Sequence, residues 1–448
     1  MTESRPVKIT DTIYRDAHQS RMATRMKTED MLPVASDINE VGFWALEMWG
    51  GATFDSCLRY LKEDPWLRVR KLREHLPDPH FMMLLRAQNV LGYRHYPDDA
   101  VAEFIRLAVK NGISVLRIFD ALNDTRNMEL AIRKTKEEGA HAQASVVYTT
   151  SPVHDVEHYV DTAVELEEMG ADSLCIKDMA GILTPTMGRR LVKEMKSELS
   201  IPIHIHCHMT AGMGAMTYLK CIEAGADIID TCLSAFAGGT AQPATESMVA
   251  ALQETEHDTG LDLDHLAQIN KHFKSVRQEY GEFFTPADID AQVLIYQIPG
   301  GMLSNLRAQL KQQGMMDKWD EVLEEVPRVR EELGYPPLVT PMSQITGTQA
   351  VMNVATGKRY SVVSKEVRDY VRGMYGRPPG EISEDVRKKV IGDEEPITCR
   401  PADLLDPILE SAREEIDEYY RRPEDVLSYI LFPEPALEYF KHREAHGE

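Results

Sequence analysis

Short apolar runs alternate with longer stretches of helical period throughout the first 255 residues of the chain. Runs rich in β-branched residues predict strands, and apolar positions that recur every three or four residues predict helices between them. Glycine follows the last turn of several of these helices, as at Gly112, Gly170 and Gly225, and favours helix termination there. The predicted strands cover residues 7–12, 43–48, 81–85, 114–119, 143–148, 173–177, 203–206 and 228–231, with helices at 98–110, 155–169 and 185–199.

Eight strands alternating with helices predict an α/β fold in which a parallel sheet closes into a (β/α)8 TIM barrel over residues 1–260. A doubly wound open sheet is the alternative, but no Gly-x-Gly-x-x-Gly turn follows the first strand. Beyond residue 260 helical patterns dominate, which predicts an all-helical C-terminal domain over residues 261–448 that completes the active-site funnel. Its expected helices are 263–281, 299–313, 319–333, 343–355, 366–375 and 404–420.

The charge balance narrows the classes of function. Lys and Arg number 50 and Asp and Glu 72, which gives a net charge of -22. Such an acidic chain is not expected to bind nucleic acid, and an anionic substrate would need a local cluster of basic side chains. The six cysteines form no Cys-x-x-Cys pair, the N-terminus is polar, and no apolar run reaches membrane-spanning length. These features predict a cytoplasmic protein with reduced thiols.

Candidate chemistry begins after the first predicted strand, because active sites of such barrels lie at the carboxyl ends of the strands. Asp16 offers a hard anionic ligand for a metal ion. Arg15 and Gln19 flank it and could bind a carboxylate or carbonyl oxygen. An isolated Arg-Asp pair would more often belong to a polar loop. A functional interpretation of this segment therefore depends on the residues at the other strand ends.

The seventh predicted strand carries the strongest local signal, three histidines at alternate positions. Because side chains alternate along a strand, His204, His206 and His208 face one side of the sheet. Three imidazoles in register at a strand end are typical of metal ligation. We predict that His206 and His208 are ligands, whereas the deeper His204 is an outer support or a core residue.

Other strand ends supply a lysine and an arginine. Lys177, at the end of the sixth strand, could bind an anionic substrate, could act as a carbamate ligand, or could form a plain surface pair with Asp178. Arg86, after the third strand, is the carboxylate anchor that the acidic chain requires. Paired glycines after the second strand permit close backbone approach, and Asp55 follows them.

These segments resemble the biotin-dependent carboxyltransferase family over about residues 7–440. That family includes the carboxyltransferase domain of pyruvate carboxylase, the alpha subunit of oxaloacetate decarboxylase and the pyruvate-handling subunit of transcarboxylase. The resemblance is carried by the runs DTIYRDAHQS, WGGATFD, RAQNVLGY, RIFDALND, CIKDMAG, HIHCHMTAG, QIPGGMLSNL and TPMSQITGTQAV.

The resemblance implies an enzyme that moves CO2 between carboxybiotin and the pyruvate/oxaloacetate pair. It implies a divalent metal, zinc with cobalt or manganese as alternatives, whose ligands would be Asp16, carbamylated Lys177, His206 and His208. The 2-oxo acid would be held by Arg15, Gln19 and Arg86. Tyr93 and Asp55 would line the pocket for the biotin ureido ring. A homodimer is expected.

Two positions depart from the common family pattern. Ser304 stands where the family usually has the threonine that shuttles a proton, so the hydroxyl is kept. Gln344 stands where pyruvate carboxylases usually have lysine, which favours the other two branches. The chain contains neither an Ala-Met-Lys-Met biotinylation motif nor an ATP-grasp module. We therefore expect a separate biotinylated carrier protein, with a biotin carboxylase, sodium-pumping membrane subunits or an acyl-CoA carboxyltransferase subunit as further partners.

A second enzyme class shares the predicted barrel. Carbon–carbon lyases and condensing enzymes that resemble hydroxymethylglutaryl-CoA lyase also carry an Arg-Asp pair and a His-x-His pair. They need neither a lysine ligand on the sixth strand nor the Pro-Gly-Gly helical region, both of which this chain has. A purely structural role within a biotin complex is the non-enzyme alternative, and the intact ligand set argues against it.

Overall fold

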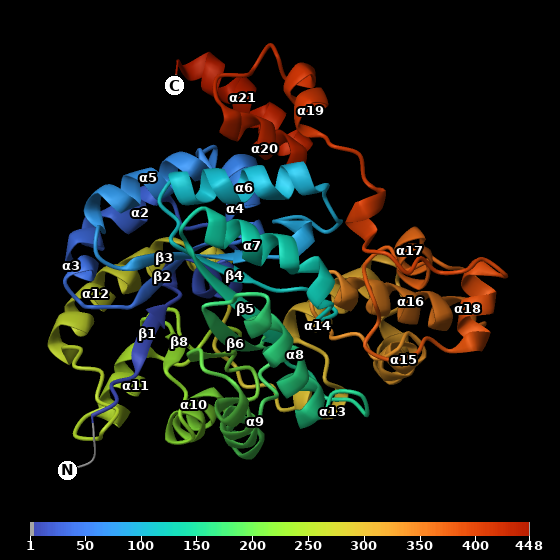
Figure 1. Cartoon of the computed structure of the whole chain (residues 1–448), viewed down its shortest axis with the longest axis horizontal. Coiled ribbons are helices and arrows are strands. Elements are labelled where there is room, and N and C mark those ends of the chain that lie inside the picture. The colour runs from blue at the N-terminus through green and yellow to red at the C-terminus, as the bar shows by residue number, and fades with distance from the viewer. Residues whose placement is uncertain (1–3, 448) are drawn as a thin grey trace.

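The computed structural model describes residues 4–447, and within α14 it leaves the side chains of residues 300, 301, 304 and 305 undescribed. Eight parallel strands pair in sequence order, and β8 pairs with β1, so the barrel is closed (Figure 1). This confirms the predicted TIM barrel and excludes the open sheet. The strands are β1 (Lys8–Asp11), β2 (Ala45–Trp49), β3 (His80–Leu85), β4 (Val115–Ile118), β5 (His141–Val147), β6 (Ser173–Asp178), β7 (Ile203–Cys207) and β8 (Ile228–Thr231).

Helices surround the barrel because each buries an apolar stripe against the outward-facing side chains of the strands. In α6, for example, Val101, Phe104, Ile105 and Ala108 are all buried. The helices of this part of the chain are α1 (His18–Arg21), α2 (Thr28–Met31), α3 (Ala35–Asn39), α4 (Gly51–Ser56), α5 (Pro65–His75), α6 (Asp98–Lys110), α7 (Glu129–Glu137), α8 (Val156–Glu168), α9 (Pro185–Glu198), α10 (Gly214–Glu223), α11 (Thr245–Leu252) and α12 (Leu263–Glu279).

A helical region follows the barrel, as expected. Its helices are α13 (Val293–Tyr296), α14 (Gly300–Gln312), α15 (Trp319–Glu332), α16 (Met342–Thr356), α17 (Lys365–Val371), α18 (Glu384–Ile391), α19 (Leu409–Glu415), α20 (Pro423–Leu431) and α21 (Pro433–His446). Helices α14 to α18 enclose a second hydrophobic core beside the barrel mouth. Helices α20 and α21 return to the outside of the barrel beside α5 and α6 (Figure 1), and apolar side chains of both, such as Leu427 and Phe440, join the barrel core. None of the described helices is long and apolar enough to cross a membrane.

Two helix predictions in this region were too long. The stretch 404–420 is interrupted, and α19 covers only Leu409–Glu415, because Pro407 disfavours helical geometry at Asp406 and cannot donate a backbone hydrogen bond. The helix expected at 366–375 ends at Val371, shortly before Gly373 takes a φ of 85°. The predicted free thiols are confirmed: all six cysteines are unpaired, and only Cys399 is exposed.

Candidate active site

Three ligand-type side chains converge at the carboxyl end of the barrel. His206 Nε2 lies 3.1 Å from His208 Nε2, and Asp16 Oδ2 lies 3.1 Å from His208 Nε2 and 3.5 Å from His206 Nε2. His206 is fully buried, while Ile205 and Cys207 face the apolar surroundings of the barrel wall, as strand alternation predicts. Asp16 reaches the cluster from a π-helical turn, Ile13–Ala17, directly after β1.

The electrostatics of this cluster favour a cation. Burial raises the pKa of Asp16, but the Arg15 guanidinium and the imidazoles of His208 and His206 outweigh it and hold this pKa well below its usual range. Burial, reinforced by the nearby Lys177, holds the pKa of His206 well below its usual value. One carboxylate and two imidazole nitrogens with converging lone pairs therefore form a candidate metal centre.

Lys177 lies beside this centre on β6, paired in register with His206 of β7. The side chain is fully buried, and its Nζ has no hydrogen-bond partner among the described residues. Burial lowers the pKa of the ammonium, which favours the neutral, nucleophilic amine. The surface-pair alternative is wrong, since both Lys177 and Asp178 are buried. An unpaired amine at this depth fits a carbamate ligand, whose oxygens would satisfy the polar demand of the site.

Two arginines face the mouth of the barrel, each against one of the paired glycines. Arg15 Nη1 lies 2.7 Å from Asp16 Oδ1, and its guanidinium packs against Gly50. Arg86 Nη1 donates to the carbonyls of Leu91 at 2.9 Å and Gly92 at 3.0 Å, and the group packs against Gly51.

The remaining predicted contacts lie around a cavity of about 890 Å³ between the barrel loops, α16, α17 and the end of α20. Asp55 and Tyr93 line it, and Gln344 contributes from α16. Asp55 is paired with Arg59 at 3.2 Å, and the Arg86 guanidinium lies 5.1 Å from the Tyr93 ring centre. A narrower cavity lined by Arg86 shares the lining residues Pro341 and Tyr375 with this one, so the two cavities are neighbours.

Two predicted residues remain to be placed. Gln19 lies in α1, directly after the turn that carries Asp16, and its Oε1 is buried without a partner among the described residues. Ser304 belongs to α14, but its side chain lies outside the described residues, so its proposed role rests on the sequence.

Gly50 offers a test of how Arg15 is positioned. A Cβ at residue 50 would lie 2.9 Å from Arg15 Nη2 and 3.0 Å from Cζ, so Gly50→Ala must displace the guanidinium. We expect kcat/KM for the 2-oxo acid to fall ~10- to 100-fold, the usual effect of misplacing a substrate-orienting group by about 1 Å. Gly281→Ala is the control, because a Cβ there meets no atom within 4 Å. Equal activities of the two variants, with unchanged melting temperatures, would contradict this role.

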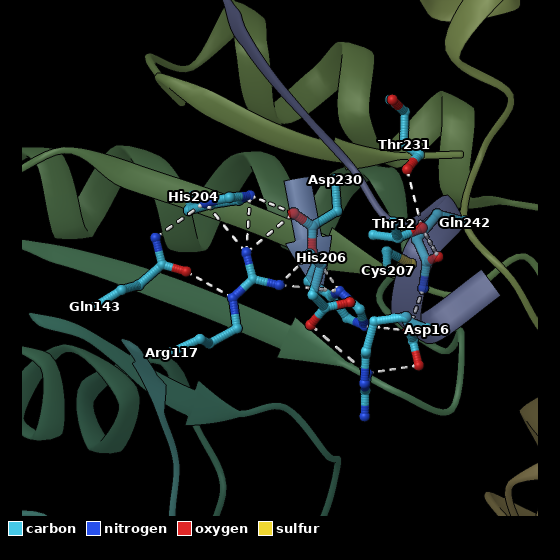
Figure 2. A network of polar contacts seen from close by, with 12 residues as sticks. Thr12, Asp16, Arg117, Gln143, His204, His206, Cys207, Asp230, Thr231 and Gln242 are labelled. Carbon is cyan, nitrogen blue, oxygen red and sulfur yellow. Dashed lines mark hydrogen bonds and ion pairs between the residues drawn. The ribbon is translucent and has the colours of Figure 1, made fainter. Parts of the chain in front are cut away.

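A buried polar network beneath the candidate metal centre was not predicted from the sequence. Glu47, Arg117 and Asp230 are fully buried inside the barrel, and Gln242 donates to Asp16 Oδ2 at 2.6 Å (Figure 2). Both carboxylate oxygens of Glu47 lack hydrogen-bond partners among the described residues, and burial raises its pKa. The sequence did contain an indication of this network, namely ionisable residues inside apolar strands. Such residues are rarely buried without a partner or a function.

Comparisons with known proteins agree with this arrangement. Residues 6–272 match a model described as HMGL-like, and residues 293–448 match one described as a conserved carboxylase domain. The chain is 56% identical over 440 residues to a pyruvate carboxylase subunit of Methanocaldococcus jannaschii, covering 97% of this chain and 78% of that protein. It is 46% identical to the methylmalonyl-CoA carboxyltransferase 5S subunit of Propionibacterium freudenreichii subsp. shermanii, covering 99% and 89%.

Comparison with solved structures agrees with these sequence matches. The carboxyl transferase domain of Rhizobium etli pyruvate carboxylase with pyruvate and biocytin superposes with a TM-score of 0.93 at 34% identity, covering 99% of this chain and 78% of that one. A closed barrel with a carboxylate, two imidazoles and two arginines at its mouth defines a barrel enzyme with a candidate metal centre. The chain belongs to the biotin-dependent carboxyltransferase family, as an enzyme of the same type as the Methanocaldococcus jannaschii pyruvate carboxylase protein and the transcarboxylase 5S protein.

These matches bear on two expectations. The HMGL-like match covers the barrel, which lyases share, but the carboxylase-domain match covers the helical region that the lyase alternative does not need. Gln344 was expected to favour the oxaloacetate decarboxylase and transcarboxylase branches. The identities do not follow that expectation, since the pyruvate carboxylase protein of Methanocaldococcus jannaschii matches at 56% and the 5S protein at 46%.

Proposed function

We propose that this enzyme transfers CO2 from carboxybiotin on a separate carrier protein to pyruvate, forming oxaloacetate, and that it also catalyses the reverse reaction. The observation that carries this proposal is the convergence of Asp16, His206 and His208 beside the buried, unpaired amine of Lys177. Carbamylated Lys177 would complete a set of two nitrogen and two anionic oxygen ligands, which suits zinc and accepts cobalt or manganese.

The substrate would be held by the arginines. Arg15 and Arg86 supply the positive charge that a 2-oxo acid needs in so acidic a chain, and Gln19 offers a further polar contact. A bound divalent metal would polarise the keto oxygen and stabilise negative charge that develops on it. Arg15, fixed against Asp16 and Gly50, would stabilise the same charge without reorganisation.

The biotin ring would enter through the large cavity, where Tyr93 and Asp55 lie. The N–CO2 bond of carboxybiotin breaks and releases CO2. The Ser304 hydroxyl accepts a proton from the pyruvate methyl group and passes its own proton to the biotin nitrogen. The electron pair of that C–H bond forms the enolate, which attacks CO2 and makes the new carbon–carbon bond. Closure of the helical region over the barrel mouth would keep water from the enolate and from CO2.

The wider assembly is part of the proposal. The resemblance to a pyruvate carboxylase protein that is itself one subunit of its enzyme favours separate partners, a biotinylated carrier and an ATP-dependent biotin carboxylase. The proposed form of this chain in that assembly is a cytoplasmic homodimer. The sodium-pumping and acyl-CoA carboxyltransferase partners of the other branches remain alternatives. Pull-down of a biotinylated polypeptide from the source organism, and identification of the proteins bound with it, would distinguish these assemblies.

The activity can be tested on the purified chain by measuring pyruvate release from oxaloacetate with and without free biotin. We expect release that biotin stimulates and that both Lys177→Ala and Ser304→Ala lose. These variants also correct for loose metal ions, which decarboxylate oxaloacetate unaided. No biotin-stimulated release from a folded, metal-loaded protein would overturn the proposal, and cleavage of an acyl-CoA substrate would then favour the lyase alternative.

A further inference from the structure

A buried ion pair crosses the interior of the barrel beneath the metal centre. Arg117 stands on β4 and Asp230 on β8, strands on opposite sides of the closed sheet, and both side chains are fully buried. The guanidinium contacts both carboxylate oxygens, with Nη2 3.0 Å from Oδ1 and Nη1 in closer contact with Oδ2 (Figure 2). This is the bidentate geometry that fixes an arginine and a carboxylate in a single relative orientation.

The Nε–H group of the arginine orients an amide. Arg117 Nε lies 2.6 Å from Gln143 Oε1, and arginine can only donate, so the oxygen of Gln143 must face it. The Gln143 amino group then points the other way. It lies 3.0 Å from His204 Nδ1 and 3.0 Å from Ser173 Oγ. His204 Nδ1 therefore accepts, and the ring proton of His204 is on Nε2.

The His204 proton points to Asp230. His204 Nε2 lies 2.6 Å from Asp230 Oδ1 and 3.1 Å from Arg117 Nη2. The carboxylate oxygen can only accept and is the nearer atom, so Nε2 donates to it. On the other carboxylate oxygen, His206 Nδ1 lies 2.5 Å from Asp230 Oδ2 and 3.4 Å from Arg117 Nη1. The nearer acceptor again places the proton on the ring nitrogen, here Nδ1 of His206. Its Nε2 then carries a lone pair, and this is the atom that meets His208 Nε2 and Asp16 Oδ2.

We propose that Arg117, Gln143 and Asp230 are positioning residues that set the tautomers of His204 and His206 and so present His206 Nε2 to the metal. The inference rests on the metal centre of the proposed function. None of the three residues is expected to touch the metal or the substrate. Outer partners of this kind usually change metal affinity or activity by about 10- to 100-fold when they are lost. Neither the sequence motifs nor the relatives' names assign a role to these residues.

Asp230→Asn is the principal variant. The amide has one acceptor and one donor side, so it cannot receive protons from both histidines, and one imidazole must change tautomer or lose its partner. We expect the dissociation constant for Zn²⁺, measured by chelator competition on the apo protein, to rise ~10- to 100-fold. The d–d absorption spectrum of the Co²⁺-loaded variant should also change in shape, because the orientation of one ligand changes.

Gln143→Met is a second variant that leaves all charges in place. It removes the amide that orients His204 and should weaken Zn²⁺ binding about three- to tenfold, below the loss at Asp230, because Arg117 still holds the carboxylate. The matched control is Asp425→Asn. Asp425 forms a buried ion pair with Arg443 at 2.9 Å, between the C-terminal helices. It should lower the melting temperature without changing the Zn²⁺ dissociation constant or the Co²⁺ spectrum.

The outcomes separate this inference from the proposed function. A wild-type protein that binds no Zn²⁺ would remove the metal centre itself. A wild type that binds Zn²⁺, with unchanged affinity in folded Asp230→Asn and Gln143→Met, would overturn the positioning role alone. If Asp230→Asn does not fold, unchanged affinity of Gln143→Met is sufficient to overturn it. A loss of affinity in Asp425→Asn equal to that in Asp230→Asn would reduce the effect to general instability and would also overturn it.

Discussion

Lys177→Ala is expected to give a folded protein that binds its metal ~100-fold or more weakly and has no measurable biotin-stimulated oxaloacetate decarboxylation. The substitution removes one of four proposed ligands, and the position it removes is fully buried, so the site loses an anionic ligand that neutral water does not replace. The fold should tolerate the change, because the amine has no hydrogen-bond partner among the described residues and its removal leaves no polar group unsatisfied. Mass spectrometry measures the metal content of the variant, and circular dichroism measures whether it is folded.

Chemical rescue distinguishes the two functional roles considered for Lys177. If the residue acts as a carbamate, formate or acetate should enter the space left by Lys177→Ala and restore part of the metal binding, because a carboxylate replaces the carbamate oxygens. If it acts as an ammonium that binds the substrate, a small alkylamine should restore activity instead. Rescue by the amine and not by the carboxylate, with metal content already normal in the variant, would contradict the carbamate assignment.

The fold was predictable because the hydrophobic pattern that identifies each strand lies within a few consecutive residues. Each strand of the barrel is a short apolar run, and each is closed off by a glycine turn or an amphipathic helix, so all eight could be placed from the sequence alone. The errors lie where the local pattern is misleading. Pro407 stands inside an acidic stretch of helical period, so α19 begins only after it. Helices α20 and α21 pack against helices more than 300 residues earlier in the chain.

Some residues of the candidate site were likewise predictable from the local sequence, and others were not. His206 in β7 and His208 directly after it are visible as alternating residues of one run, and register between β6 and β7 brings Lys177 beside His206. The partnership of Arg117 with Asp230 depends on closure of the barrel, which brings β4 and β8 face to face across the interior. No local period predicts such a contact. The sequence shows only that a charged residue lies within an apolar strand. This identifies the residue as unusual but does not identify its partner.

Ser304→Ala is expected to lower kcat for biotin-dependent exchange ~10²- to 10⁴-fold, the usual contribution of a group that transfers a proton in the transition state. Its metal content should equal that of the wild type, in contrast to Lys177→Ala, because Ser304 is not among the proposed ligands. KM for the 2-oxo acid should change little, since binding is assigned to the arginines. Stopped-time assays of pyruvate release, at saturating oxaloacetate with and without biotin, measure the loss.

Two further variants make the assignment specific to the hydroxyl. Ser304→Thr keeps a hydroxyl, which the family usually supplies from threonine at this position, and should retain most of the activity. Ser411→Ala, in α19, removes a helix hydroxyl whose one hydrogen bond within the described part of the chain is to the backbone carbonyl of Ile408, and it should behave as wild type. Full biotin-stimulated activity in Ser304→Ala would exclude the proton shuttle. Equal losses in Ser304→Ala and Ser304→Thr would instead show that the site needs the size of serine and not its proton.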